Sequence, residues 1–373
     1  MGQARPLGNH GEWTGERPVT ITYLVLALLF IAYHAYRWYA ATPYATVPPC
    51  TWVPAADAPK VSFLVPAWNA ARDIPAFVAS YQSITYHHKE LILCAGGGDG
   101  SFEIAQRFAS DGVKVLEQKP GEGKQKALGR SFPASDGDLI YLTDIDCRPS
   151  DEVVNNLLAH VADGTAAVAT GASRPLDDQR SDPFVLTQWA VEQATQPRVP
   201  TNTSGLLGRN AALTRAAVDA TGGFATSAPS GTDYTLAKEV LREGFDIRFV
   251  PGSPMPTEYP ATFGMYARKQ ARWIRNVFVL GGRHGATAEV RATLLTLLLP
   301  YSLCCLLLVA VVGVGLAGFL ALLFVVHAVI NRLRHLHRAN LPLDVLGALR
   351  HFLADQAAAL RAGWQIVNRR TTW

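Results

Sequence analysis

Residues 139–146 have the sequence Leu-Ile-Tyr-Leu-Thr-Asp-Ile-Asp, an apolar run followed by two aspartates one residue apart. The run has the length of a buried strand, so Asp144 and Asp146 are expected at its carboxyl end. Open α/β sheets bind their ligands at this edge. Two hard carboxylate oxygens there suit Mg²⁺ or Mn²⁺ carrying a phosphorylated substrate. The stretch therefore predicts a parallel-sheet fold with a divalent-cation site. An ordinary turn at the end of a strand is the alternative.

The composition of the chain indicates a membrane protein. Of its 373 residues, 17% are charged and 49% are hydrophobic, whereas soluble domains carry about 25% charged residues. The length favours one core domain with additions. A net charge of +4 is too small to indicate a nucleic-acid partner, and none is expected.

The cysteines indicate neither a disulfide framework nor a zinc site. Their number is odd, no Cys-X-X-Cys spacing occurs, and two of them lie in an apolar run: Cys50, Cys94, Cys147, Cys304 and Cys305. A reducing compartment is expected for the catalytic part.

The first membrane segment is expected over residues 19–40, after an N-terminal tail of residues 1–18. Its apolar part, residues 19–36, is just long enough to cross the roughly 30 Å hydrocarbon core. A secretory signal peptide is the alternative. It is disfavoured because acidic residues offset the basic ones in the preceding tail.

A transmembrane hairpin is expected over residues 292–331. Residues 292–330 carry no charge, which is enough for two spans, and Gly313, Gly315 and Gly318 mark the expected turn. Basic residues flank the run on both sides, most densely in the segment 266–291. Because positive charge favours the cytoplasmic side, both flanks and residues 41–291 are expected in the cytoplasm, at the plasma membrane. One long tilted helix is the less favoured alternative.

Residues 343–370 have a helical pattern with polar residues between the apolar ones. Leu349, Phe352, Leu360 and Trp364 recur at helical spacing. The pattern predicts an amphipathic helix on the bilayer surface. A helix packed against the soluble domain is the alternative.

Strand-like and helix-like segments alternate from residue 59 to residue 265, after a proline-containing linker over 41–58. Strands are predicted over 61–65, 90–94, 113–116 and 138–143, and helices over 71–83 and 101–110 and after Gly121–Lys124. Such alternation predicts a mostly parallel sheet covered by helices.

Five motifs occur in the order found in the family 2 glycosyltransferases, which this chain resembles. They are Val61–Asn69, Gly123-Lys124 with Ala127-Leu128, Leu139–Asp146, Thr232-Asp233-Tyr234, and Lys269-Gln270-Ala271-Arg272-Trp273. The resemblance implies a GT-A fold, an α/β architecture, to which the apolar segments described above add one N-terminal and two C-terminal transmembrane helices. It also implies a nucleotide-sugar donor, a divalent cation (Mg²⁺ or Mn²⁺) and inversion at the sugar C1. Few spans and the Arg-Trp motif make the chain most similar to ceramide glucosyltransferase-like members of the Gln-X-X-Arg-Trp group.

The three aspartates have distinct expected roles. Asp146 is the expected metal ligand, and Asp144 is expected to face the ribose or base of the nucleotide. Asp233, at the start of a predicted helix over 234–243, is the expected general base, because a helix N-terminus stabilises a carboxylate. An ordinary capping aspartate is the alternative.

The resemblance implies that five further residues bind the nucleotide sugar: Pro66, Trp68, Asn69, Asp99 and Lys124. Trp68 replaces the more usual tyrosine, and Cys94 and Ala95 stand where relatives carry aspartates, so the contact of Asp99 with the base stays open. Lys124 is expected at the donor phosphates, with a solvated surface lysine as the alternative.

Arg272 and Trp273 are expected at the diphosphate and the acceptor, because a guanidinium suits phosphate oxygens and an indole stacks on a ligand. Anchoring of the chain at the membrane interface is the alternative. Lys269, at the first position of the motif, replaces the usual Gln or Arg, so its role in the same site is open.

The leading hypothesis is transfer of a hexose, from a UDP-glucose-type donor, to a hydroxyl of a membrane lipid. A base such as Asp233 favours a hydroxyl acceptor over an already anionic phosphate. One alternative is a processive polysaccharide synthase subunit, since processive relatives carry the Arg-Trp motif. The other is a catalytically inactive membrane scaffold, motivated by the changes at Cys94, Ala95 and Lys269.

Overall fold

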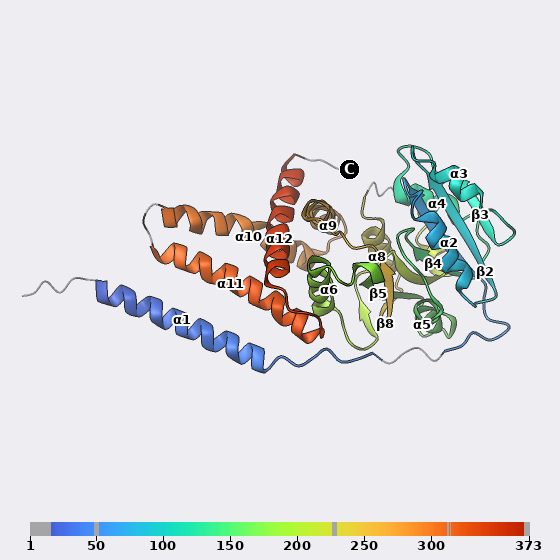
Figure 1. The fold of residues 1–373 in the computed structure, drawn as a ribbon. Helices are drawn as coiled ribbons and strands as arrows, with labels where there is room; N and C mark the ends of the chain where they lie inside the picture. Colours follow the sequence, from blue (N-terminus) through green and yellow to red (C-terminus); the bar gives the residue numbers. More distant parts are fainter. Residues whose placement is uncertain (1–15, 48–51, 226–229, 312, 314, 369–373) are drawn as a thin grey trace, which may run out of the picture.

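A computed structural model of the protein describes residues 16–47, 52–225, 230–311, 313 and 315–368. In these residues one sheet of eight strands has the order β3-β2-β1-β4-β7-β5-β8-β6 (Figure 1). The strands are β1 Val61–Trp68, β2 Lys89–Gly96, β3 Val113–Glu117, β4 Leu139–Thr143, β5 Val168–Pro175, β6 Thr201–Thr203, β7 Asn210–Thr214 and β8 Ile247–Thr257.

The sheet is mostly parallel, as the sequence predicts. β1 pairs in parallel with both β2 and β4, β2 with β3, and β5 with β8. β7 and β6 run antiparallel to their neighbours. β4 is buried along its whole length, which explains its unbroken apolar sequence.

Alternate residues of each central strand enter two different cores. Phe63 packs with the helices α2 (Ile74–Ser83) and α5 (Asp151–Ala162) on one face. Leu64 packs with α4 (Gly123–Ser131), α7 (Arg215–Ala220) and α8 (Thr232–Arg242) on the other. The short α3 (Ser101–Gln106) follows β2 on the first face. The expected helices near 71 and 101 are thus confirmed, with shorter extents.

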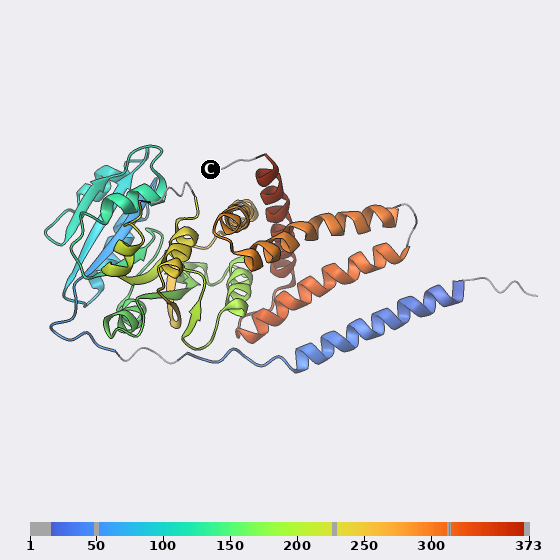
Figure 2. The ribbon, with the colours of Figure 1, turned by 180° about the vertical axis from the view of Figure 1, so that it is seen from behind.

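Three helices long and apolar enough to cross a membrane project from one side of the sheet domain (Figures 1 and 2). They are α1 (Glu16–Tyr39), α10 (Thr287–Val311) and α11 (Gly315–Arg338). Gly313 takes a left-handed φ of 97° between α10 and α11, so the run forms two helices and one long helix is wrong. That the two helices cross a membrane stays a prediction. Gly318 lies inside α11 rather than in the turn. α1 contacts α11 through His34 and His327, whose ring nitrogens are 3.1 Å apart.

Three more helices lie between the sheet and the membrane helices: α6 (Pro183–Thr195), α9 (Phe263–Arg283) and α12 (Val345–Val367). α12 packs on α9 through small residues, Ala358 and Ala362. Its large apolar side chains Leu346, Leu353 and Trp364 are exposed. Figure 1 shows α12 crossing α10 and α11 steeply. The helix therefore both packs against the domain and presents an apolar surface.

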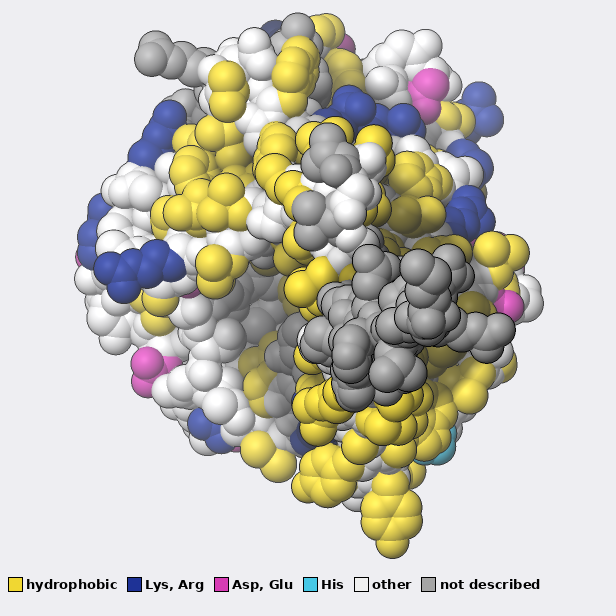
Figure 3. Space-filling view, turned by 90° about the vertical axis from the view of Figure 1, so that its left-hand side faces the viewer, with side chains coloured by type: hydrophobic (Ala, Val, Ile, Leu, Met, Phe, Trp, Pro, Cys, Tyr) yellow, Lys and Arg dark blue, Asp and Glu magenta, His cyan; other side chains and the backbone are white. Residues whose placement is uncertain are grey.

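Hydrophobic side chains dominate the end of the molecule that carries these helices. Figure 3 views this end, with Lys and Arg side chains lying mainly toward the rim. The exposed apolar residues include Leu24, Leu28, Leu295 and Leu308. An apolar surface bordered by basic residues is typical of a segment that enters a bilayer.

Acid is expected to weaken the attachment of α12, because His351 is buried there as a neutral acceptor. The Arg332 guanidinium donates to its Nδ1 over 2.9 Å, and the Asp355 carboxylate lies 3.5 Å away. Burial lowers the pKa of His351 to about 4, and Arg332 adds to this while Asp355 opposes it. An unfolded histidine titrates near 6.5. Neutral His351 therefore contributes its full stabilisation of the folded state above about pH 6.5, and this contribution is lost as pH falls toward 4.

Thermal melting of the protein from pH 7 to pH 4 measures this effect. Between pH 7 and pH 4, the free energy of unfolding should fall less in His351→Gln than in the parent protein, by on the order of 3 kcal/mol. The exposed His87 is the control, and His87→Gln should melt like the parent. An unchanged acid response in His351→Gln would contradict the assignment.

Candidate active site

The carboxyl ends of β1, β2 and β4 form one edge of the sheet, and most of the expected site residues lie there. The register places Leu64 of β1 opposite Leu142 of β4, so both strands leave the sheet on the same side. Trp68 is the last residue of β1 and pairs with Gly96 of β2. Asp144 and Asp146 follow β4 directly. Parallel pairing thus brings residues distant in sequence to one edge.

Lys124, in the first turn of α4, connects two of the expected motifs. Its Nζ is 2.8 Å from Asp144 Oδ1 and 3.2 Å from Asp233 Oδ1. Burial lowers the pKa of Lys124, but the two carboxylates outweigh it and raise the pKa above its ordinary value. The lysine is therefore a fixed cation between the two aspartates. A solvated surface lysine, the alternative expected from the sequence, is wrong.

Asp233 lies in the first turn of α8 but is not its capping residue. The cap position is Gly231, with a left-handed φ of 79°, and no side chain caps the helix. The carboxylate of Asp233 is 40% exposed. It is thus accessible and placed at the positive end of a helix, as a general base requires. The ordinary capping role is wrong.

Gly208 lies directly against the carboxylate of Asp233. A methyl group at Gly208 would stand 2.3 Å from Asp233 Oδ1 and 2.5 Å from its Cγ. Only a residue without a side chain lets Asp233 occupy its present position. The glycine therefore determines where the carboxylate can lie.

Gly208→Ala is expected to lower the turnover rate by about tenfold or more while the fold is retained, because displacing a reacting group by about 1 Å is costly. Gly205→Ala is the matched control, since a Cβ at Gly205 meets no atom within 4 Å. Initial-rate kinetics and thermal melting of both variants measure the effect. Equal turnover in the two would mean that the position of Asp233 does not matter.

Asp146 is a half-buried carboxylate surrounded by cations. Burial, followed by the charge of Asp144, raises its pKa, and Lys269, Arg209 and Lys124 oppose the rise. The Cys147 thiol, a weak donor, lies 3.7 Å from Asp146 Oδ1. Because the charge of Asp144 repels that of Asp146, a bound cation would stabilise the ionised pair.

The residues present fit a Mg²⁺ or Mn²⁺ ion that shares its ligands with a substrate. Among the described residues, no group of three or more His, Cys, Asp or Glu side chains forms a complete cage. Mg²⁺ is commonly held by one or two carboxylates together with waters and substrate phosphates. Asp146 and the neighbouring Asp144 supply that number of oxygen ligands.

Arg209 was not expected from the sequence. It follows Gly208 in a loop, donates to Ser173 Oγ over 2.7 Å, and lies 3.5 Å from Glu192 Oε1. Its charge also acts on Asp146. No motif marks Gly208 or Arg209, and only the fold brings their loop to the aspartates.

The helix α9 carries Lys269 and Arg272, the basic residues of the motif Lys269–Trp273. Burial lowers the pKa of Arg272, and the charges of Asp233 and Asp144 oppose this. Burial and Arg209 lower the pKa of Lys269, which Asp146 opposes. Both cations thus belong to the aspartate cluster. Trp273 is 62% exposed, and its stacking on an acceptor stays a prediction.

Asn69 and Asp99 lie in two neighbouring loops, one after β1 and one after β2. Asn69, with a left-handed φ of 50°, accepts a hydrogen bond from the Gly98 amide over 2.9 Å. Asp99 accepts from the Ser101 hydroxyl at 2.5 Å and from the Ala71 amide at 3.0 Å. These bonds join the ends of β1 and β2. They hold the carboxylate of Asp99 within the loop, and its contact with a base stays a prediction.

Trp68 and Pro66 lie at the same end of β1. Trp68 is 42% exposed and Pro66 is half-buried. Both are accessible to a ligand at the sheet edge.

Residues 58–276 match the family model described as glycosyltransferase-like family 2. The chain belongs to this family. The resemblance expected from the five motifs is thereby confirmed, although nothing singles out the ceramide glucosyltransferase-like group.

Two curated relatives of this family 2 chain carry activity names. It is 26% identical over 235 residues to the probable glycosyltransferase YdaM of Bacillus subtilis strain 168, covering 59% of this chain and 55% of the relative. It is 28% identical over 241 residues to an N-acetylglucosaminyltransferase of Rhizobium leguminosarum bv. viciae, covering 59% and 56%. The chain thus spans about half the length of the curated relatives it matches.

The fold of this family 2 chain is found in a solved mannosyltransferase from Pyrobaculum calidifontis, determined with GDP-Man and Mn²⁺. The TM-score is 0.62 at 18% identity, over 95% of this chain and 98% of the other. The GT-A fold is thereby confirmed.

A carboxylate of α10 connects the helix that carries Asp233 to the membrane part of the family 2 chain. Glu289 accepts a hydrogen bond from the Tyr234 hydroxyl over 2.5 Å and one from the Ser204 hydroxyl over 3.2 Å. It also pairs with the Lys238 ammonium. Tyr234 and Lys238 lie one turn apart on α8, so α10 is joined to the helix of the expected base. The sequence marks Tyr234 only as a motif neighbour and gives no sign of this link.

Proposed function

We propose that the protein is an inverting glycosyltransferase that moves a hexose from a nucleotide sugar to a hydroxyl of a membrane lipid. The observation that carries the proposal is the position of Lys124, which contacts both Asp144 and Asp233. It places the expected base and the expected donor-binding carboxylate on either side of one fixed cation. A base on one side of the cation and a donor-binding carboxylate on the other is the arrangement that a transfer reaction needs, so the geometry supports the proposal beyond the presence of the motifs.

In the proposed reaction the acceptor oxygen attacks C1 of the sugar while the bond from C1 to the diphosphate oxygen breaks. Asp233 receives the proton of the acceptor hydroxyl, and the nucleoside diphosphate leaves from the opposite face, which inverts C1. Asp233 lies in the first turn of α8, where the helix N-terminus carries positive partial charge. Arg272 and Lys124 supply positive charge near the leaving diphosphate.

A divalent cation would be held by Asp146, with Asp144 beside it. When bound, such an ion neutralises charge that develops on the diphosphate. The cations Lys269 and Arg209 balance the carboxylate of Asp146 from the protein side. Mg²⁺ and Mn²⁺ both suit this donor set.

A lipid acceptor is supported by the arrangement of helices around the site. The helix that carries the expected base is joined through Tyr234 and Glu289 to α10, a candidate membrane span. α12 lies across the spans with apolar side chains exposed, which suits an amphipathic helix in the bilayer interface. We further propose that the sheet domain faces the cytoplasm at the plasma membrane, because basic residues flank both ends of the α10–α11 hairpin.

A donor panel tests the proposal. Purified protein in phosphatidylcholine vesicles that contain total host lipid extract is given UDP-glucose, UDP-GlcNAc or GDP-mannose, each with Mg²⁺ or Mn²⁺. We expect nucleoside diphosphate release together with sugar label in the organic phase for one donor, UDP-glucose being the leading choice. No turnover with any donor, from protein that melts cooperatively, would contradict the function and favour an inactive scaffold.

A processive synthase is the second candidate, supported by the place of Arg272 within the aspartate cluster. Sizing of the labelled product separates the two candidates. A single glycolipid supports one transfer per acceptor, and a ladder of lengths supports polymerisation.

A further inference from the structure

An arginine cluster lies where α1 and α11 reach the sheet domain. Arg37 is in the last turn of α1, and Arg334 and Arg338 are in the last two turns of α11. Arg198 follows α6. Its guanidinium carbon lies 3.9 Å from the centre of the Tyr44 ring, and that of Arg338 lies 4.4 Å from the same point. Figures 1 and 2 show α1 and α11 side by side, with these ends toward the domain. Segments distant in sequence thus bring four positive charges together.

No carboxylate of the described residues balances these charges. None of the four arginines forms an ion pair within the described chain, whereas Arg332 on the same helix α11 pairs with Asp355. The strongest charges acting on Arg334 are those of Arg37 and Arg338, and both repel it. The C-terminal ends of α1 and α11 supply only about half a negative elementary charge each. The arginine cluster therefore keeps an excess of positive charge.

Arg334 is the buried member of the arginine cluster. It is 8% exposed, and its Nε is buried without a hydrogen-bond partner among the described residues. Burial of an unpaired charge is costly. The Arg37 guanidinium donates to the Tyr33 hydroxyl over 2.8 Å, and that of Arg338 donates to the Thr42 carbonyl over 2.9 Å. Because a guanidinium has five N–H donors, most donors of both arginines remain for a ligand.

The position of the cluster indicates which anion would bind there. α1 and α11 are candidate membrane spans, so their domain-side ends lie at the headgroup level of a surrounding bilayer. Trp38 stacks on His337 at the same ends, with ring centres 5.2 Å apart, and tryptophan is typical of this level. Guanidinium groups suit phosphate oxygens. Basic pockets between spans at this level bind the headgroups of anionic lipids.

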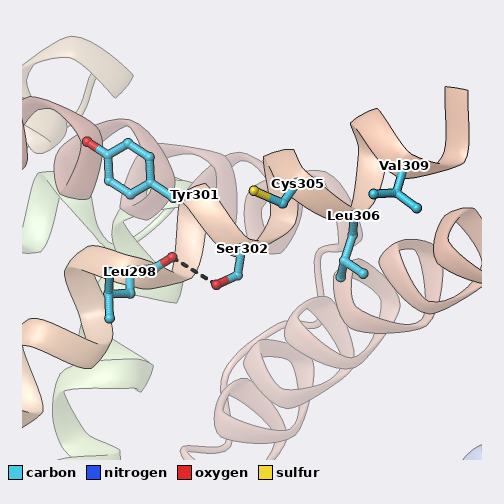
Figure 4. Close-up of a pocket in the computed structure, with 6 residues that line it drawn as sticks. All are labelled: Leu298, Tyr301, Ser302, Cys305, Leu306 and Val309. Atoms are coloured by element: carbon cyan, nitrogen blue, oxygen red, sulfur yellow. Dashed lines mark hydrogen bonds between the residues drawn. The ribbon is translucent and has the colours of Figure 1, made fainter. Parts of the chain in front are cut away.

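Neither the aspartate cluster nor the exposed face of α10 offers the same chemistry. Aspartate charges act on Lys269 and Arg272, whereas the charged groups that act on Arg198 are Tyr44 and another arginine. The open hollow on α10 is lined by uncharged side chains, which would not select an anion (Figure 4). The arginine cluster is therefore separate from both.

We propose that the arginine cluster binds the phosphate of an anionic lipid headgroup, with Arg334 as its buried donor. The bound headgroup supplies the negative charge that the cluster lacks, and it joins α1 to α11 and to the end of α6. The inference goes beyond the proposed sugar transfer and does not rest on it.

Arg334→Gln tests the site in the full-length protein. Thermal melting is measured in nanodiscs of phosphatidylcholine, with and without phosphatidylglycerol. With phosphatidylglycerol at about a hundredfold above its Kd, we expect the melting temperature of the parent protein to rise by roughly 5 °C. A tenfold weaker affinity should reduce this rise to about half in Arg334→Gln. Arg361→Gln, which removes an exposed arginine of α12, is the matched control and should respond like the parent.

A merely structural role of Arg334 predicts a different pattern. Removing an unpaired buried charge should leave the melting temperature in pure phosphatidylcholine unchanged or higher. A lower melting temperature in both lipids, with the parental response to phosphatidylglycerol, would overturn the proposal. So would equal responses of Arg334→Gln and Arg361→Gln. Inorganic phosphate added to phosphatidylcholine nanodiscs should have no effect, and a rise as large as that with phosphatidylglycerol would contradict a lipid ligand.

A second measurement uses the unsubstituted protein and decides the matter if Arg334→Gln does not melt cooperatively. Phosphatidylglycerol with a diazirine in its headgroup is irradiated in nanodiscs that contain the protein, and the labelled residues are mapped by mass spectrometry. Labelling concentrated on residues 37–44 and 334–338 supports the site. Equal labelling of α12, which also carries exposed arginines, overturns it.

Discussion

Replacing Asp233 with asparagine is expected to reduce sugar transfer by about 10²- to 10⁴-fold, the usual contribution of a general base. The amide cannot receive the acceptor proton, yet it keeps nearly the same shape against Gly208. Donor binding should change little, because the expected nucleotide contacts other than Lys124 lie at the ends of β1, β2 and β4. Single-turnover transfer and nucleotide-sugar binding, measured separately, check both statements.

The exposed Asp111 is the control for charge alone, and Asp111→Asn should leave transfer unchanged. Asp233→Asn also removes a partner of Lys124, so thermal melting is needed to show that the fold survives. Transfer at the parental rate by folded Asp233→Asn would refute the base assignment.

Removing the metal is expected to have the second largest effect. Chelation of the parent protein and the substitution Asp146→Asn should each lower transfer by about 10²- to 10³-fold, comparable to the loss of one group that stabilises charge on a leaving group. The two treatments should not add, because both act on the same ion. Transfer rates with and without EDTA, followed by readdition of Mn²⁺ or Mg²⁺, measure this.

Asp144→Asn separates the two carboxylates. If Asp144 faces the nucleoside, this variant should lose donor affinity but still respond to added metal, unlike Asp146→Asn. Transfer that persists in EDTA would contradict the metal assignment. Loss of the metal response in Asp144→Asn would instead place the ion between both residues.

The first half of the fold could be predicted because its strands carry local signals. β1, β2 and β4 are buried on both faces, and each is therefore an apolar run in the sequence. β5 and β8 lack such runs, since they contain glycine, serine and proline and pair over long distances with a bulge near Gly171. Their pairing depends on tertiary contacts that no short window of sequence contains.

The candidate site was predictable only as an ordered series of motifs. Order along the chain does not say that Lys124 contacts two carboxylates 20 and 109 residues away in sequence. Gly208 and Arg209 gave no signal at all, because a glycine packed against a carboxylate looks like any loop glycine. Trp273 and Asp99 show the converse, since both fit a motif while their side chains lie exposed or bound within a loop.

The bond between Glu289 and Tyr234 joins α10, a candidate membrane span, to the helix that carries Asp233, so a bilayer around α10 would act on that helix. A span longer or shorter than the surrounding hydrocarbon adapts by tilting. Tilting of α10 would shift Glu289, and with it the helix that carries Asp233. If Asp233 is the base, as proposed, membrane thickness would act on the geometry of proton transfer, and the transfer rate is expected to depend on the chain length of the host lipids as a whole.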